Sequence, residues 1–145
     1  MPVLLDTNIL VRLLQPHHPD CSIAERAINV LHSRNEVLTI TTQNLVEFWA
    51  VITRPAGENG LGFTIEQAAE EVGVLKRLFV LLPEVPLLQE WERLTTTYRV
   101  SGKTIHDARL VAAMIVHGIG SILTFNVQDF ARFTEILVVD PRKVV

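Results

Sequence analysis

The strongest constraint on the fold of this chain is the alternation of short apolar runs with longer amphipathic stretches. Runs of three or four mostly apolar residues are typical of buried strands. The longer stretches carry apolar residues at helical spacing, over residues 22–34, 42–53, 64–79, 87–98 and 110–116, with a further helix starting near residue 9. Strands that alternate with helices predict an α/β fold, a single domain over 1–145 with a central, mostly parallel sheet of about five strands and helices on both faces. The five expected strands are Val3–Leu5, Val37–Ile40, Val80–Leu82, Ile122–Thr124 and Ile136–Val139.

Composition bounds the class of protein. Hydrophobic residues make up 48% of the 145 residues, which is enough for a core without disulfides and suggests that some apolar surface covers a partner or a second subunit. The single cysteine, Cys21, cannot form an internal disulfide. Neither a signal peptide nor an apolar stretch long enough to span a membrane is visible. We therefore expect a cytoplasmic protein that does not contact a membrane.

The charge balance argues against a protein that simply coats nucleic acid. The formal net charge is −3, whereas such proteins are usually basic. If four carboxylates were metal ligands, however, the remaining charge would be slightly positive and the site would attract phosphate. The net charge therefore weakens a nucleic-acid function without excluding it.

Asp6 follows the first expected strand directly and precedes the first expected helix. One interpretation is that it only caps that helix by accepting hydrogen bonds from free N–H groups, a role for which Asp is a favoured residue. The other is that it is the first ligand of a metal site, because ligands of open α/β sheets bind beyond the carboxyl ends of the strands. Taken alone, Asp6 fits the capping role better, so the other acids of the chain decide.

Glu47 and Asp107 are two such acids, each in the first turn of a helix whose other residues are mostly apolar. The helix that carries Glu47 is apolar nearly all round, and we expect it to be buried. A buried carboxylate needs a partner of opposite charge, or it shifts to its neutral form. Capping boxes, Asn44 with Glu47 and Thr104 with Asp107, would explain both positions. They would not explain why the helices around these acids are so apolar, so we favour the ligand interpretation for Glu47.

The expected topology brings these acids together. Asp6, and Asn126 with Asp129, follow apolar strands, and the strand-to-helix turns of a parallel sheet converge on one edge. Clustered carboxylates raise one another's pKa unless a cation holds them ionised. Oxygen ligands without a Cys/His set select Mg²⁺ or Mn²⁺ rather than Zn²⁺. The chemistry that this indicates is metal-assisted hydrolysis of a phosphodiester by an activated water.

Two other phosphate chemistries fit less well. The glycine-rich stretch 55–62 lacks the Gly-Lys-Ser/Thr ending of a phosphate-binding P-loop, and we expect it to be a flexible connection. A phosphatase that uses Asp6 as its nucleophile would usually carry a second Asp two residues later, where this chain has Asn8.

Four short motifs resemble those of the PIN-domain ribonucleases, most closely the VapC-type toxins of prokaryotic toxin–antitoxin pairs. The resemblance covers essentially the whole chain. It implies an endoribonuclease that depends on Mg²⁺ or Mn²⁺, often a homodimer, held inactive by a small cognate antitoxin. By position, Asp6, Glu47 and Asp107 would be acidic metal ligands, supported by Thr7, Asn8 and Thr124. The motifs are Leu5-Asp6-Thr7-Asn8, Asn44-Leu45-Val46-Glu47-Phe48, His106-Asp107-Ala108 and Thr124-Phe125-Asn126-Val127-Gln128-Asp129-Phe130.

The fourth acidic position departs from the family pattern. Many members have Asp where this chain has Asn126, and Asn is a neutral and poorer ligand. Either Asp129 substitutes or a second metal binds more weakly. This departure also leaves a second hypothesis open, that of a PIN-fold module that binds RNA or a protein without cutting. In either case, candidates for contacts to RNA phosphates are Arg54, Lys103 and Arg109.

Overall fold

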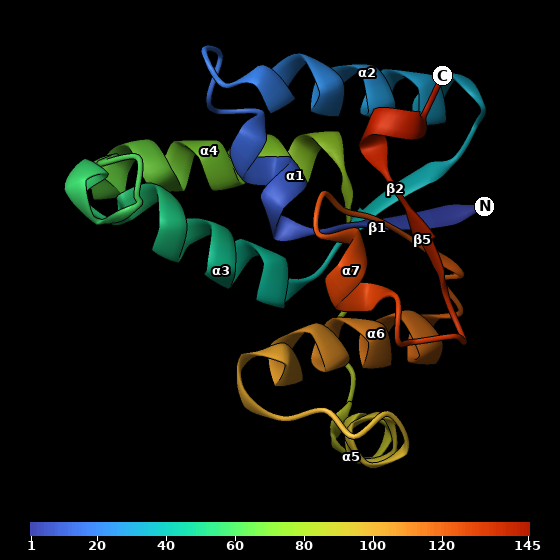
Figure 1. Ribbon diagram of the computed structural model, residues 1–145. Coiled ribbons are helices and arrows are strands. Elements are labelled where there is room, and N and C mark those ends of the chain that lie inside the picture. The colour runs from blue at the N-terminus through green and yellow to red at the C-terminus, as the bar shows by residue number, and fades with distance from the viewer.

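The computed structural model describes residues 1–145 and contains one five-stranded sheet in which every neighbouring pair of strands is parallel (Figure 1). The strand order is β3-β2-β1-β4-β5, so the first strand lies at the centre. The chain moves from β1 outward to β3 and then returns to the other side of β1 with β4. The sheet therefore has its topological switch point between β1 and β4. The strands are β1 (Pro2–Leu5), β2 (Val37–Ile40), β3 (Val80–Leu81), β4 (Ser121–Leu123) and β5 (Leu137–Val139).

The central strand β1 packs against both layers of helices. Val3 and Leu5 belong to the larger apolar core, whereas Leu4 between them belongs to the smaller one. Because successive side chains of a strand point to opposite faces, a strand covered on both faces must be apolar at every position. This requirement explains the unbroken Val3-Leu4-Leu5 run.

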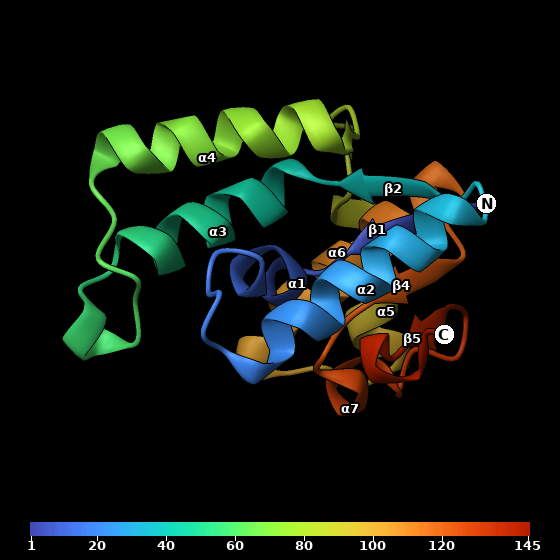
Figure 2. The same ribbon diagram turned by 90° about the horizontal axis from the view of Figure 1, so that it is seen from above.

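Helices cover both faces of the sheet, as predicted (Figures 1 and 2). The larger core is closed by α1 (Thr7–Arg12), α2 (Pro19–Ser33), α3 (Thr42–Thr53) and α4 (Ile65–Leu78). The smaller core is closed by α5 (Leu88–Thr97), α6 (Ile105–His117) and the short α7 (Val127–Phe130). Single 3₁₀ turns lie at η1 (Ala56–Glu58), η2 (Gly102–Thr104) and η3 (Pro141–Lys143). No helix combines the length and the apolar character that crossing a bilayer requires.

Helix α3 is not buried all round, which corrects the expectation drawn from its apolar sequence. Asn44, Phe48 and Ile52 form its fully buried stripe, at i, i+4 and i+8. Val46, on another face, is 64% exposed. One face of the helix is therefore buried and another is exposed, although apolar residues lie on both. Part of its apolar surface is open to solvent.

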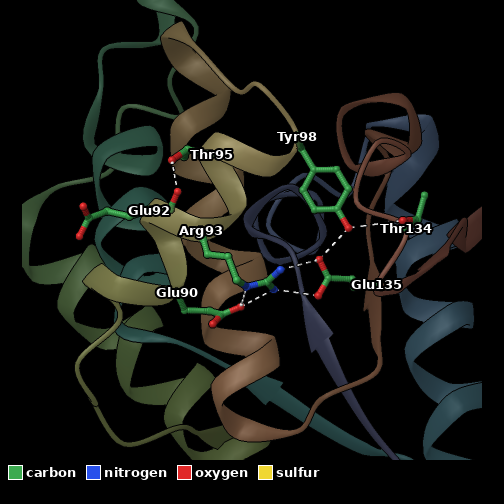
Figure 3. A network of polar contacts seen from close by, with 7 residues as sticks. All are labelled: Glu90, Glu92, Arg93, Thr95, Tyr98, Thr134 and Glu135. Atoms are coloured by element: carbon green, nitrogen blue, oxygen red, sulfur yellow. Dashed lines mark hydrogen bonds and ion pairs between the residues drawn. The ribbon is translucent and has the colours of Figure 1, made fainter.

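A polar network on the surface fastens α5 to the segment that precedes β5 (Figure 3). Arg93 donates to Glu90 on its own helix and to Glu135, with Nη2 2.7 Å from Glu135 Oε1. The Tyr98 hydroxyl donates to Glu135 Oε2 at 2.6 Å. These donors, Arg93 first, lower the pKa of Glu135. The network joins residues 42 positions apart in the sequence and closes the smaller core at its rim.

The glycine-rich stretch after α3, which we expected to be a flexible connection, contains the 3₁₀ turn η1 and backbone hydrogen bonds to the end of α3. The Gly60 amide donates to the Pro55 carbonyl, and the Gly62 amide donates to the Arg54 carbonyl at 2.9 Å. The Gly62 amide thus gives the Arg54 carbonyl a donor just beyond the end of α3. The Pro55 carbonyl also accepts from the Glu58 amide at 2.8 Å. Gly60 lies so close to Arg54 that an added Cβ would be 2.0 Å from the Arg54 carbonyl oxygen.

We therefore predict that Gly60→Ala lowers the free energy of unfolding by about 1–3 kcal/mol, because the methyl group collides with backbone atoms that cannot move away freely. Gly57→Ala in the same turn is the matched control, since its Cβ meets no atom within 4 Å. Urea unfolding at equilibrium measures both variants. Equal midpoints for the two variants would contradict the close approach at Gly60.

Candidate functional site

The candidate site lies at the switch point of the sheet, beyond the carboxyl ends of β1 and β4. Asp6 follows β1 and Thr124 follows β4, and both side chains are buried. The Asp6 amide donates to the Leu123 carbonyl, which continues the pairing of the two strands to the start of the site. The two strand ends are therefore held in register at the point where the polar side chains begin.

Asp6 is fixed by three donors. Its Oδ1 accepts from the Thr7 amide at 2.8 Å, which is the helix cap that the sequence indicated. Its Oδ2 accepts from the Thr124 hydroxyl at 2.7 Å and from the Asn8 side-chain amide at 3.2 Å. Asp6 is therefore both a cap and a member of a polar cluster, so the two interpretations of this residue are compatible.

Thr124 and Asn8 tie the β1 turn to the β4 turn. The Asn8 amide donates to the Thr124 hydroxyl as well as to Asp6, and the Asn8 side-chain carbonyl accepts from the Phe125 amide. The Thr124 hydroxyl also accepts from the Asn126 amide at 3.0 Å. These contacts hold in place the turn that leads to Asp129.

Glu47 is held by a second chain of hydrogen bonds that starts from a fully buried amide. Asn44 donates from Nδ2 to the Thr7 hydroxyl at 3.1 Å, and that hydroxyl donates to Glu47 Oε1 at 2.8 Å. Glu47 Oε2 accepts from Gln43 Nε2 at 3.3 Å. Thr7 thus connects Asp6, through its backbone, with Glu47, through its side chain.

Neither acid in α3 or α6 is explained by a capping box. The box of α3 is formed by Thr41 and Asn44, so Glu47 takes no part in it. Thr104 at the start of α6 makes no side-chain capping bond, so Asp107 is not the partner of a cap either. These two findings remove the structural alternatives that the sequence had left open.

Asp107 is half-buried in the first turn of α6, where it continues the buried stripe of Leu110, Val111 and Met114. Burial raises its pKa to about 7, with further increases from the charges of Asp6, Asp129 and Glu47. The cation that opposes this shift is Arg132. The structure therefore brings the four predicted acids into electrostatic contact.

The pKa of Asp6 is also shifted in this cluster. Burial raises its pKa to about 6, against the hydrogen bonds from Thr124 and Thr7 that lower it, while Glu47 and Asp129 raise it further. Clustered acids with raised pKa values are a frequent property of catalytic centres. Each acid here can both exchange a proton near neutral pH and hold a cation when ionised.

The remaining predicted residues lie at different distances from this cluster. Asp129 is exposed on α7, and its charge acts on both Asp6 and Asp107. Asn126 is exposed and joins the site through its backbone amide. Arg54 follows the last residue of α3, about 10 Å along the helix axis from Glu47. Lys103 is exposed in η2. Arg109 lines a neighbouring cavity instead of facing the acids.

The acids fit a hard divalent cation that keeps much of its water. No three Asp, Glu, His or Cys side chains are arranged to coordinate one ion without rearrangement. Mg²⁺ usually takes only one or two protein carboxylates and fills its other positions with water and phosphate oxygens. The clustered carboxylates, with raised pKa values that a cation would lower again, match that requirement.

Comparison with known proteins identifies the family. The model of the PIN domain family matches residues 3–136. The chain belongs to the PIN-domain family. No curated protein sequence matches this PIN domain.

Solved structures share the fold of this PIN domain over nearly its whole length. VapBC2 from Rickettsia felis, bound to a DNA fragment from its promoter, has a TM-score of 0.71 and 16% identity over 96% of this chain and 98% of that chain. VapBC-1 from nontypeable Haemophilus influenzae has a TM-score of 0.70 and 21% identity, covering 99% and 100%. Mycobacterium tuberculosis VapC20, a toxin that cleaves the sarcin–ricin loop, has a TM-score of 0.64 and 19% identity, covering 90% and 95%.

The roles of three residues of the site were not predicted from the sequence of this PIN domain. Gln43 and Asn44 hold Glu47 directly and through Thr7, and Arg132 acts on Asp107. Gln43 precedes Glu47 by four residues, a spacing that places both on one face of a helix. That spacing was the available signal for Gln43. Arg132 lies in a connection whose path the local sequence does not determine.

The raised pKa values predict how the stability of the metal-free protein depends on pH. The folded state binds more protons than the unfolded state between about pH 4 and pH 7, so stability falls as pH rises through this window. Asp107→Asn removes one of the repelling charges. With a chelator present at pH 8, we expect this variant to be more stable than wild type by about 1 kcal/mol, a value discounted for the partial exposure of Asp107.

Thermal unfolding measures this difference, with an expected rise in midpoint of about 2–4 °C at pH 8. At pH 4.5 the two proteins should differ little, because Asp107 of the wild type is then protonated. A variant that is less stable than wild type at pH 8 would show that the carboxylate is not held against like charges.

Proposed function

We propose that this PIN domain is an endoribonuclease that depends on Mg²⁺ or Mn²⁺ and acts as the VapC-type toxin of a toxin–antitoxin pair. The observation that carries the proposal is the convergence of four acids at the switch point, where two of them have raised pKa values. The structural likeness to VapBC proteins, one of them a toxin that cleaves the sarcin–ricin loop, supports RNA as the substrate.

Asp6, Glu47, Asp107 and Asp129 would hold the cation. When bound, Mg²⁺ or Mn²⁺ supplies Lewis-acid activation of water and stabilises negative charge on the phosphodiester oxygens. Thr124 and Asn8 orient Asp6, and Thr7 and Gln43 orient Glu47, so that two ligands are fixed before substrate binds. Arg132, whose positive charge acts on Asp107, is a candidate for contact with a substrate phosphate.

The fourth position of the site is assigned to Asp129, with Asn126 in a supporting place. Asp129 carries the charge that acts on both Asp6 and Asp107, whereas Asn126 is neutral. Asp129 lies on an exposed four-residue helix, so it has fewer constraints than the other three acids. We infer that it binds the cation more weakly than Asp6, Glu47 and Asp107 do.

We further propose that the protein works in the cytoplasm, is held inactive by a small antitoxin, and forms a homodimer. The likeness to VapBC toxin–antitoxin structures supports the antitoxin. The open apolar surface of α3 and α4 supports contact with a protein partner. That surface includes Val46, 64% exposed, beside Leu45, Trp49 and Val72.

The second candidate function is binding of RNA or protein without cleavage, which Asn126 favours because it removes one acid from the family pattern. Wild-type protein, Asp107→Asn and Glu47→Gln separate the two functions, and Glu70→Gln, exposed on α4, is the matched control. With Mn²⁺ and mixed RNA, we expect each site variant to cleave on the order of 100-fold more slowly, as is typical for loss of transition-state charge stabilisation. The control should keep the wild-type rate.

Inducible expression in a bacterial host gives the cellular counterpart of this measurement. Wild type should arrest growth and create new RNA 5′ ends, whereas Asp107→Asn should do neither. Purified wild type that binds RNA but leaves it intact at every Mn²⁺ concentration would reject the nuclease in favour of the binding module.

The hydrogen-bond chain from Asn44 through Thr7 to Glu47 predicts the effect of removing one hydroxyl. Thr7→Val keeps the shape of the side chain but loses the donor to Glu47, so we expect Mn²⁺ affinity to fall about 10–100-fold, as for other groups that orient metal ligands. Thr7→Ser retains the hydroxyl and should bind Mn²⁺ as wild type does. Calorimetric titration measures both, and equal losses in the two variants would assign the effect to packing instead.

A further inference from the structure

A cavity of about 260 Å³ adjoins the acid cluster at the same edge of the sheet. It opens between the turn that follows β2, the segment that follows β3, and the facing sides of α5 and α6. Neither the metal ligands nor the residues that orient Asp6 line it. The cavity is thus separate from the metal site proposed above, although both lie beyond strand ends.

Gln43 forms the partition between the cavity and the acid cluster. Its side chain lines the cavity, and its amide nitrogen donates both to Glu47 Oε2 at 3.3 Å and to the His106 carbonyl at 2.8 Å. A group in the cavity would therefore lie one side chain away from Glu47. If an RNA strand is held at the acid cluster, a base in this cavity would belong to a nearby nucleotide of the same strand.

The walls of the cavity differ in chemistry. One wall is apolar and aromatic, with Trp91 beside Leu82 and Leu87. The indole N–H of Trp91 donates to the Ile105 carbonyl at 2.9 Å, which fixes the ring and leaves its carbon surface for contact. This wall is a rigid, flat surface rather than a flexible one.

Another part of the lining comes from α6, where Arg109, Ala113 and His117 follow one another at i, i+4 and i+8. Arg109 belongs to none of the ion pairs of the chain. It lies two residues beyond Asp107, so the two side chains leave the helix on different faces. Arg109 therefore lines this cavity from a helix face different from the one that carries Asp107. The sequence named it only as a candidate for contacts to RNA phosphates.

We propose that the cavity binds a nucleobase of the RNA strand, at a nucleotide next to the cleaved phosphodiester. The proposal rests on the proposed function. Single-stranded RNA is recognised by stacking of splayed bases on aromatic rings and guanidinium planes, with hydrogen bonds to the base edges. An aromatic ring and an Arg without an ion pair line the same cavity and match that chemistry, whereas a phosphate alone would not use the apolar wall.

The first test measures binding without cleavage. The chain has two tryptophans, and Trp49 lies on α3 at a different surface, so Trp49→Phe leaves Trp91 as the only fluorescent indole. The probes are the four nucleoside 5′-monophosphates, with ribose 5-phosphate as the control, in the presence of a chelator. We expect saturable quenching by at least one nucleotide and none by ribose 5-phosphate.

Arg109→Ala in this background should weaken nucleotide binding about 5–150-fold, the range that corresponds to losing one stacked or bidentate base contact. Arg26→Ala, exposed on α2, is the matched control and should leave binding unchanged. No quenching by any nucleotide, equal quenching by ribose 5-phosphate, or equal effects of the two Arg variants would each overturn the proposal.

The second test uses cleavage of an RNA oligonucleotide in which each nucleotide in turn is replaced by an abasic ribose. One abasic position beside the cut should lower kcat/KM about 5–150-fold in wild type and have little further effect in Arg109→Ala. An oligonucleotide that is not cut at all would reject the proposed nuclease, and the binding test would still decide on the cavity. If Arg109→Ala changes neither nucleotide binding nor the abasic profile but weakens binding of the antitoxin, the cavity serves the antitoxin and the proposal fails.

Discussion

Repulsion among carboxylates beyond the carboxyl ends of the central strands is the constraint on which the rest of this structure depends. Folding brings Asp6, Glu47, Asp107 and Asp129 together from four separate stretches of the chain. Hydrogen-bond donors offset part of the free energy that burying these carboxylates together costs. All the buried polar side chains except Thr39 belong to the network around Asp6 and Glu47, namely Asp6, Thr7, Thr41, Gln43, Asn44 and Thr124. A core that is otherwise apolar is therefore polar only where it holds these acids.

Much of the fold follows from the local sequence. The five strands and six of the seven helices lie where the apolar runs and the helical spacing indicated, with boundaries that differ by a few residues. The short helix α7 was not predicted. The position of β1 at the centre is consistent with its unbroken apolar run. The order of the other strands is set by long-range pairing, which no local pattern records, and the expectation of a buried α3 was wrong because composition does not show which face of a helix finds a partner.

The acids of the candidate site could be predicted from the sequence, but the side chains that orient them could not. Asp6, Glu47 and Asp107 stood out because each is a carboxylate beside apolar residues, a combination that needs an explanation. The side chains that orient them are ordinary polar residues whose partners are distant in sequence. Thr7 and Glu47 are 40 residues apart, and Gln43 and the His106 carbonyl are 63 apart. Only the packing of α3 beside the first residues of α1 and α6 makes these pairs.

Helix α6 shows how one element can serve several tasks without conflict. Its buried face, with Leu110, Val111 and Met114, fixes the helix in the smaller core. Asp107 continues that face into the acid cluster, so its position is as rigid as the core itself. The face with Arg109 and His117 looks into the neighbouring cavity. Because a helix separates residues two apart onto different faces, the chain can place an anionic group and a cationic group almost side by side in sequence while keeping their charges from neutralising each other. The proposed metal site and the proposed base site thus each take one charged residue from α6, and the helix fixes the positions of Asp107 and Arg109 relative to each other.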